Sequence, residues 1–184
     1  MSYFDNFEAK DAEILRAFNN DVNFFKEITC NEKGSRIDIT ARTKKGKKCH
    51  IELKQRVGKY KSFDEFTVNF DSIFLATSKV DAFSKIMSSG HTLNEKELFV
   101  SIFDDGDTII IHDVLKPQQI EWLPNQRLWN PGTKQWDYEH RLGFYWQNGI
   151  IYTKQKDGHY KRWTKEDYEN QEEYVIRRRE NMIN

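Results

Sequence analysis

Two neighbouring segments with alternating apolar and polar residues constrain the fold of this chain more than any other feature. They span residues 35–43 and 47–55. Successive side chains of a strand point to opposite faces of a sheet, so each segment predicts a strand with one apolar face. The turn at 44–46 has a length that suits an antiparallel hairpin. The apolar residues are Ile37, Ile39 and Ala41 in the first segment and Cys49, Ile51 and Leu53 in the second.

The polar face of this predicted hairpin carries ionisable groups from both strands. Asp38 lies on the first strand, and Glu52 and Lys54 lie on the second. Two carboxylates can bind Mg²⁺ or Mn²⁺, and the bound ion can polarise a phosphate ester and help to deprotonate a water molecule. This pattern therefore predicts metal-assisted cleavage of a phosphodiester bond. The alternative is a cross-strand salt bridge on a sheet that faces solvent.

The order of a helix, three strands and a carboxylate-x-lysine element resembles the PD-(D/E)xK nuclease superfamily. The matching residues are Asp38 and the run Glu52-Leu53-Lys54, although Ile37 stands where the family has its proline. Small Holliday junction resolvases within the superfamily also have a helix acid followed by apolar residues at +3, +4 and +7, and Asp11 fits that pattern. Its apolar partners at these offsets are Ile14, Leu15 and Phe18.

The resemblance implies a restriction-endonuclease-like core, which is an α/β fold with a central mixed sheet flanked by helices. It also implies a metal-dependent DNA nuclease, an endonuclease on branched or structured DNA that acts as a homodimer. Asp38, Glu52, Asp11 and the Leu53 carbonyl would bind Mg²⁺ or Mn²⁺. Lys54 would orient the attacking water or neutralise charge on the phosphate. The alternative for Asp11 is an ordinary acidic residue in the first half of the helix, where the helix dipole favours a negative charge.

Basic residues gather around the predicted hairpin, although the chain has no net charge. The 29 basic and 29 acidic residues do not favour tight non-specific binding to nucleic acid. A local patch matters more than the total, and the segment 42–61 has Glu52 as its only acid. The alternative is a solvated face of the hairpin. The residues predicted to contact DNA are Lys44, Lys45, Lys47, Gln55, Arg56 and Lys59.

The pattern along the chain predicts two parts, a nuclease-like core over 1–116 and a Trp-rich extension over 117–184 that packs on it. All five Trp residues follow residue 120, and we expect them to fill a small satellite core rather than to stack on bases. The expected core elements are a helix over 3–19, a central strand over 72–77, a helix over 80–89 and a hairpin of 97–103 with 108–114. The expected elements of the extension are loops and short strands over 117–149, a hairpin of 150–153 with 159–161 and a helix that begins at Thr164 and runs to about Arg179.

The cysteine and histidine residues form no metal-binding motif in the sequence. Cys30 and Cys49 lack zinc spacing and predict buried thiols in a reducing compartment. His50 is predicted to lie at the surface and His112 in the core. No apolar run reaches the length of a membrane span and no signal pattern opens the chain, so we expect a cytoplasmic protein with no membrane contact.

A second function stays open at the level of the sequence. The neutral charge and the Trp-rich third also suit a non-catalytic module that binds nucleic acid or protein and keeps the nuclease-like fold, such as a phage or mobile-element accessory protein. In a nuclease, the carboxylates of Asp38 and Glu52 would have to approach within about 4–5 Å to share one cation.

Overall fold

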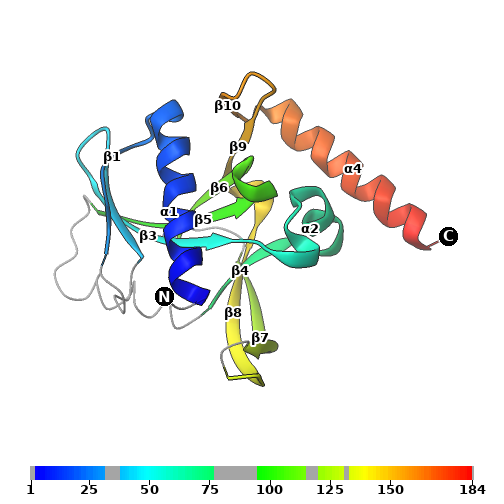
Figure 1. Ribbon diagram of the computed structural model, residues 1–184. Helices are drawn as coiled ribbons and strands as arrows, with labels where there is room; N and C mark the ends of the chain where they lie inside the picture. The colour runs from blue at the N-terminus through cyan, green and yellow to red at the C-terminus, as the bar shows by residue number, and fades with distance from the viewer. Residues whose placement is uncertain (1–2, 32–37, 77–94, 115–119, 131–132, 184) are drawn as a thin grey trace.

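A computed structural model describes residues 3–31, 38–76, 95–114, 120–130 and 133–183 of the chain (Figure 1). The helices are α1 (Tyr3–Val22), α2 (Phe63–Asn69) and α4 (Lys165–Ile183). The strands are β1 (Phe25–Cys30), β2 (Ile39–Thr43), β3 (Lys48–Gln55), β4 (Ser72–Ala76), β5 (Glu95–Phe103), β6 (Thr108–Asp113), β7 (Ile120–Asn130), β8 (Gln135–Tyr145), β9 (Ile150–Lys154) and β10 (Tyr160–Arg162). Short 3₁₀ turns span Gly58–Tyr60, Asp104–Gly106 and Trp146–Asn148.

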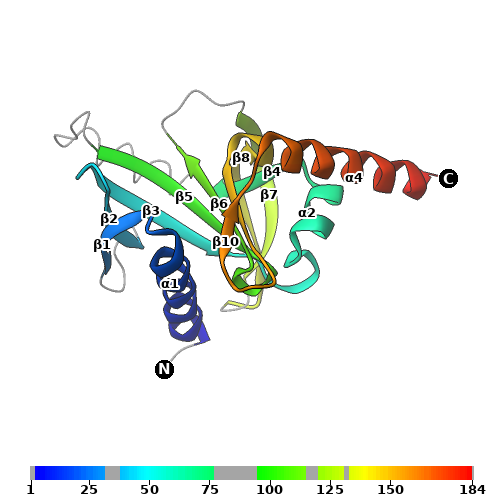
Figure 2. The same ribbon diagram turned by 90° about the horizontal axis from the view of Figure 1, so that it is seen from above.

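The strands form one large mixed sheet and one small antiparallel sheet. The large sheet has the order β1-β2-β3-β5-β6-β9-β10, and the small one has the order β4-β8-β7. Within the large sheet β3 and β5 run parallel, whereas the other neighbours are antiparallel. A parallel pair needs a crossover of a dozen or more residues, and the chain between β3 and β5 supplies it. The prediction of a mixed α/β fold with a central sheet is confirmed (Figure 2).

Helix α1 covers one face of the large sheet. Its buried residues Ala12, Leu15 and Phe18 pack on a face that includes Ile39 and Ile51. The predicted helix over 3–19 is confirmed and continues to Val22. Each apolar side chain buried in this way contributes about 1.5–3 kcal/mol, so the helix is held by this stripe rather than by its own propensity.

The opposite face of the large sheet is covered by the small sheet and α2. The aromatic side chains of Phe63, Phe99, Phe144 and Trp146 are buried in this second cluster. The segment 72–77 was expected to be a central strand, but among the described residues β4 is an edge strand that pairs with β8 alone. Its residues are apolar because it packs face-on against the large sheet, which the sequence does not distinguish from a central position.

The expectation of loops and short strands over 117–149 is wrong. Two strands of 11 residues, β7 and β8, form a long hairpin that projects from the body of the molecule (Figure 1). Trp136 and Tyr138 alternate with Asp137 and Glu139, but the Pro, Asn and Gly residues of 117–149 favour loops over a strand, and the outer half of β8 is exposed on both faces. Within it, Trp136 is half exposed and lies under the Arg127 guanidinium, 4.2 Å from ring centre to Cζ.

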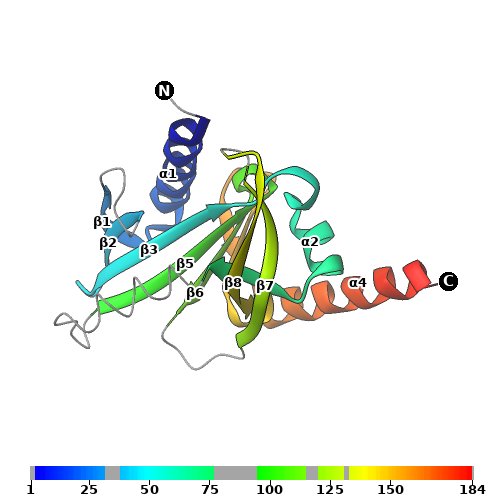
Figure 3. The same cartoon turned by 90° about the horizontal axis from the view of Figure 1, so that it is seen from below.

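The C-terminal elements follow the sequence prediction closely. The predicted hairpin of β9 and β10 is confirmed and extends the large sheet beside β6. Helix α4 begins with a capping box, in which the Thr164 amide donates to Asp167 and the Asp167 amide donates to Thr164 Oγ1. It continues past Arg179 to Ile183 and extends away from both sheets (Figure 3).

Two predicted segments fall outside the part of the chain that the structure describes. The predicted helix over 80–89 and the start of the predicted strand at 35–37 lie outside the described residues. The division at 116/117 stays a prediction, although β9 and β10 join the same sheet as the strands before residue 117. No helix in the described part of the chain is long and apolar enough to cross a membrane.

His112 is a core residue, as the sequence predicts. Its side chain is fully buried in β6, and its Nε2 lies 3.1 Å from the carbonyl oxygen of Tyr145. Burial favours the neutral ring and lowers the pKa of His112 from 6.5 to about 4, against a smaller upward effect of the Tyr145 hydrogen bond.

We expect this histidine to make the fold sensitive to acid. Between pH 6.5 and about 4 the unfolded chain binds a proton at residue 112 and the folded protein does not, so stability falls as the pH is lowered through that range. The loss approaches ~3 kcal/mol at the lower end. Urea unfolding at several pH values measures it. The neutral variant His112→Gln should lose this part of the pH dependence, and an unchanged slope would assign it to other groups.

Candidate active site

The register of β2 against β3 places Asp38 and Glu52 across from each other. Ile39 pairs with Ile51 and Thr40 with His50, so the register continued by one residue sets Asp38 opposite Glu52. Both side chains therefore belong to the same face of the sheet, as the sequence predicts. Asp38 lies just before β2 begins, and its Oδ2 accepts a hydrogen bond from the Leu53 amide at 3.0 Å. This bond fixes the carboxylate beside the Glu-Leu-Lys run.

Asp11 reaches the same edge of β3 from α1. The amide of Gln55 donates to its carboxylate, two residues beyond the amide that Asp38 accepts. The amides of Leu53 and Gln55 point to the same side of β3, because alternate amides of a strand have the same direction. Beyond the end of β2, the carboxylates of Asp38 and Asp11 accept these two hydrogen bonds in place of backbone carbonyl groups. Asp11 is half-buried, and desolvation raises its pKa to about 6, with a smaller upward effect from Asp38 and a downward effect from Lys54.

Glu52 is buried and pairs with Lys54. The Glu52 side chain has no exposed surface, whereas that of Lys54 is 52% exposed, and the Lys54 Nζ lies 3.6 Å from Glu52 Oε1. An ionised carboxylate in the interior is costly unless a cation compensates it. The four residues predicted as catalytic therefore lie toward the end of β3: Asp38 and Asp11 accept the Leu53 and Gln55 amides, and Glu52 pairs with Lys54.

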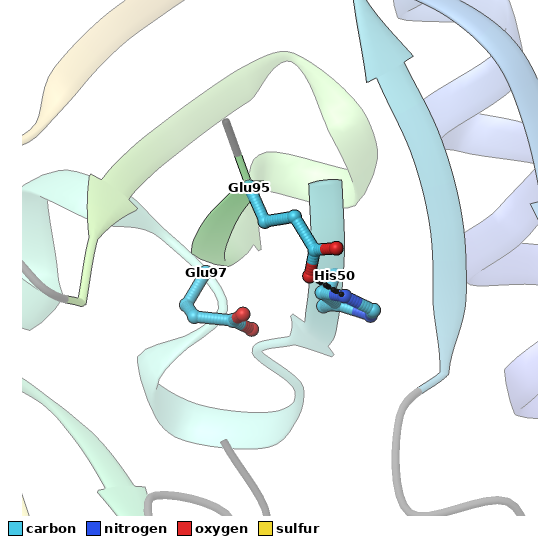
Figure 4. A group of neighbouring side chains, drawn as sticks. All are labelled: His50, Glu95 and Glu97. Atoms are coloured by element: carbon cyan, nitrogen blue, oxygen red, sulfur yellow. Dashed lines mark hydrogen bonds and ion pairs between the residues drawn. The ribbon is translucent and has the colours of Figure 1, made fainter. Parts of the chain in front are cut away.

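Their carboxylates do not form a closed metal-binding triad. Among the residues that the structure describes, one group of three or more His, Cys, Asp or Glu has all its ligand atoms within 4.8 Å of one another, and it is His50, Glu95 and Glu97 (Figure 4). An ion at the predicted site would therefore be held by fewer protein ligands, with water completing the shell. Mg²⁺ is commonly bound in this way.

The His50–Glu95–Glu97 group was not foreseen from the sequence. His50 is only 6% exposed, so the prediction of a surface histidine is wrong. It pairs with Glu97 in the parallel register of β3 and β5, and Glu95 lies on the same face two residues earlier. Alternate acids at 95 and 97 are visible in the sequence. The pairing that brings them to His50 depends on a long crossover, which no local pattern reveals.

The residues predicted to contact DNA separate into two groups at opposite ends of β3. Lys44, Lys45 and Lys47 lie in or beside the hairpin turn, whereas Gln55 and the residues after it lie at the far end. Eight residues of strand span about 25 Å, so the two groups do not form one continuous patch. Gln55 is half-buried, and Lys59 is exposed with its Nζ 5.2 Å from the centre of the Tyr60 ring.

Arg56 does not face outward, which corrects its prediction as a DNA-contacting residue. Its Nη2 donates to the carbonyl oxygen of Phe74 at 3.1 Å, and its Cζ lies 5.6 Å from the centre of the Phe66 ring. Burial lowers the pKa of Arg56 to about 10. The side chain packs inside the molecule because the chain turns under α2 immediately after β3.

The hairpin lysines border a cavity of about 430 Å³ on the α1 side of the sheet. Its apolar part is formed by Val22, Phe24 and Tyr152, and its cationic side by lysines. A cavity of this kind suits an anionic ligand with an apolar portion. The lysines that line it are Lys44, Lys45, Lys47 and Lys96.

The cysteines and tryptophans agree only in part with their predictions. Cys49 is buried, but Cys30 is exposed because it lies on β1 at the edge of the sheet. Trp146 is buried and Trp163 packs against the same aromatic cluster, but this cluster includes Phe99 and Ile110 of the large sheet, so it is part of the main core rather than a small satellite core.

Comparison of the chain with models of protein families, with curated proteins and with solved structures finds no match. The resemblance to PD-(D/E)xK nucleases therefore stays a prediction from the residues of the sequence.

Proposed function

We propose that this protein is a metal-dependent DNA nuclease that hydrolyses phosphodiester bonds at the end of β3. The observation that best supports the proposal is the buried Glu52 carboxylate, which has the half-exposed Lys54 ammonium 3.6 Å away and Asp38 opposite it. The half-exposed ammonium can be approached by a phosphate from solvent, and the acids beside it offer oxygen ligands for a metal ion.

The donor set fits a hard divalent cation. Asp38, Glu52, Asp11 and the Leu53 carbonyl offer oxygen atoms, which Mg²⁺ and Mn²⁺ prefer. When bound, such an ion supplies Lewis-acid polarisation of the phosphate and a more acidic water molecule. Lys54 can place its ammonium against the phosphate oxygens, where negative charge increases during cleavage. The Leu53 and Gln55 amides hold the Asp38 and Asp11 carboxylates in position.

We extend the proposal to an endonuclease that acts on branched or structured DNA as a homodimer. The support is the helix pattern around Asp11, whose partners Leu15 and Phe18 are fully buried while Asp11 itself reaches the end of β3. The hairpin lysines beside the cavity offer a second cationic surface for the DNA backbone.

An assay on several forms of DNA tests this function. Supercoiled, linear, single-stranded and four-way-junction DNA are incubated with the protein and Mg²⁺, Mn²⁺ or EDTA. We expect cleavage with either ion, strongest on the junction, and none with EDTA. Asp38→Asn should abolish cleavage, because it removes one ligand charge while its amide oxygen still accepts the Leu53 hydrogen bond.

A second candidate function is a binding module without catalysis. The observation that favours it is that Asp11 and Asp38 each accept a strand amide, which is a structural role that needs no ion. In that case the wild-type protein would retard junction DNA in a gel but leave every substrate intact at saturating Mn²⁺.

A further inference from the structure

We propose that His50, Glu95 and Glu97 form a binding site for a first-row transition-metal ion of the Zn²⁺ class, separate from the predicted Mg²⁺ site. Figure 4 shows the three side chains turned toward one another, His50 from β3 and both glutamates from β5. Their ligand atoms lie within 4.8 Å of one another, and His50 Nε2 is 3.2 Å from Glu95 Oε2.

The distances are near those that a bound ion requires. Zinc binds imidazole nitrogen and carboxylate oxygen at about 2.0–2.2 Å, so tetrahedral ligand atoms are about 3.4 Å apart. The His50–Glu95 pair already has this spacing, and the other distances among the three ligand atoms are at most 4.8 Å, so a small side-chain movement can close the site. The backbone needs no change, because the parallel register of β3 and β5 sets the positions of all three residues.

Burial distinguishes this group from a chance cluster of surface acids. His50 is 6% exposed and Glu97 is fully buried, whereas the Glu95 side chain is 21% exposed and gives a path to solvent. The lysine between the two glutamates, Lys96, points to the other face, where its Nζ pairs with Asp113 at 2.8 Å. A dication at the centre would balance two carboxylates beside a neutral imidazole.

The ligand types select the metal. An imidazole nitrogen favours Zn²⁺ and its transition-metal neighbours over Mg²⁺ and Ca²⁺, which prefer all-oxygen shells. Three protein ligands leave a fourth position for water. Such an ion would bridge β3 to β5 and stabilise the pairing of the two strands that the long crossover joins. Glu52 lies two residues from His50 on the same face, about 7 Å along β3.

Zinc binding by the full-length protein tests the proposal without any activity assay. Protein stripped with EDTA is titrated with Zn²⁺ by calorimetry, and its metal content after dialysis is measured by plasma mass spectrometry. We expect one Zn²⁺ per chain, not displaced by excess Mg²⁺, and a higher melting temperature in the loaded protein. His50→Gln and Glu95→Gln should each weaken binding by about 100-fold or more.

Two control variants separate this site from other possibilities. His159→Gln removes an exposed imidazole on the β9–β10 hairpin and should leave zinc affinity unchanged. Asp38→Asn alters the predicted cleavage site and should also leave it unchanged, so the inference can fail or hold independently of the nuclease. If His50→Gln does not fold, as judged by circular dichroism, the part-exposed Glu95→Gln decides. Absence of stoichiometric zinc, binding unaltered by Glu95→Gln, or loss of binding in Asp38→Asn would each overturn the proposal.

Discussion

In the proposed nuclease, replacing Lys54 with alanine is expected to lower the rate of metal-dependent DNA cleavage by about 100-fold or more and to leave the fold intact. The ammonium lies 3.6 Å from the buried Glu52 carboxylate, and half of the side chain reaches solvent, where a phosphate can approach it. Its removal takes away a positive charge at the atoms where negative charge develops. DNA affinity should change little, because one contact among several is lost. Single-turnover cleavage of junction DNA with saturating Mg²⁺ measures the effect.

The matched control is Lys161→Ala. Lys161 is 59% exposed and its Nζ lies 4.0 Å from Asp167, so it resembles Lys54 in exposure and in pairing but lies on β10. The Lys161→Ala variant should cleave junction DNA at the wild-type rate. Circular dichroism shows whether loss of the Lys54 charge beside buried Glu52 disturbs folding. Equal activity of Lys54→Ala and wild type would show that cleavage occurs at another site or comes from a contaminant.

The part of the candidate site that could be predicted is the part that local strand geometry determines. The alternation of residues around Asp38 and Glu52 predicts which face each side chain takes, and a short turn fixes the register between the two strands. The apolar spacing after Asp11 likewise predicts that α1 packs on the sheet with Asp11 near its edge. Strand alternation, turn length and helix spacing each depend on residues close together in the chain, so one sequence is enough to predict them.

The part that could not be predicted depends on pairing between distant segments. His50 becomes buried because β5 lies alongside β3, and Arg56 becomes buried because α2 and β4 cover it. Strand β4 has the composition of a central strand, yet in the part of the chain that the structure describes it pairs on one side only. In each case the local residues allow several environments, and the topology selects one. A lysine-rich run near an active motif therefore does not by itself indicate which cations face a ligand.

Trp146→Ala is expected to destabilise the protein more than any other single change considered for its core, by about 3–5 kcal/mol. The indole is 1% exposed and lies in the turn that connects β8 of the small sheet to β9 of the large one. It contacts the Phe63 ring edge-to-face, with 5.9 Å between centroids. Truncation leaves a cavity between the two sheets. For a chain of this size the melting temperature should fall by about 6–20 °C.

Trp136→Ala is the matched control, since Trp136 lies on β8 but is 50% exposed and has the Arg127 guanidinium over its ring. The Trp136→Ala substitution should lower the free energy of unfolding by less than about 1 kcal/mol.

Calorimetry of both variants also tests the division at 116/117. If Trp146→Ala shifts one cooperative transition, the residues before and after 117 unfold as a unit, which the shared large sheet favours. Two separate transitions, with only one shifted, would instead support an independently folding extension. Equal melting temperatures for the two variants would show that the Trp146 cluster does not join the sheets energetically.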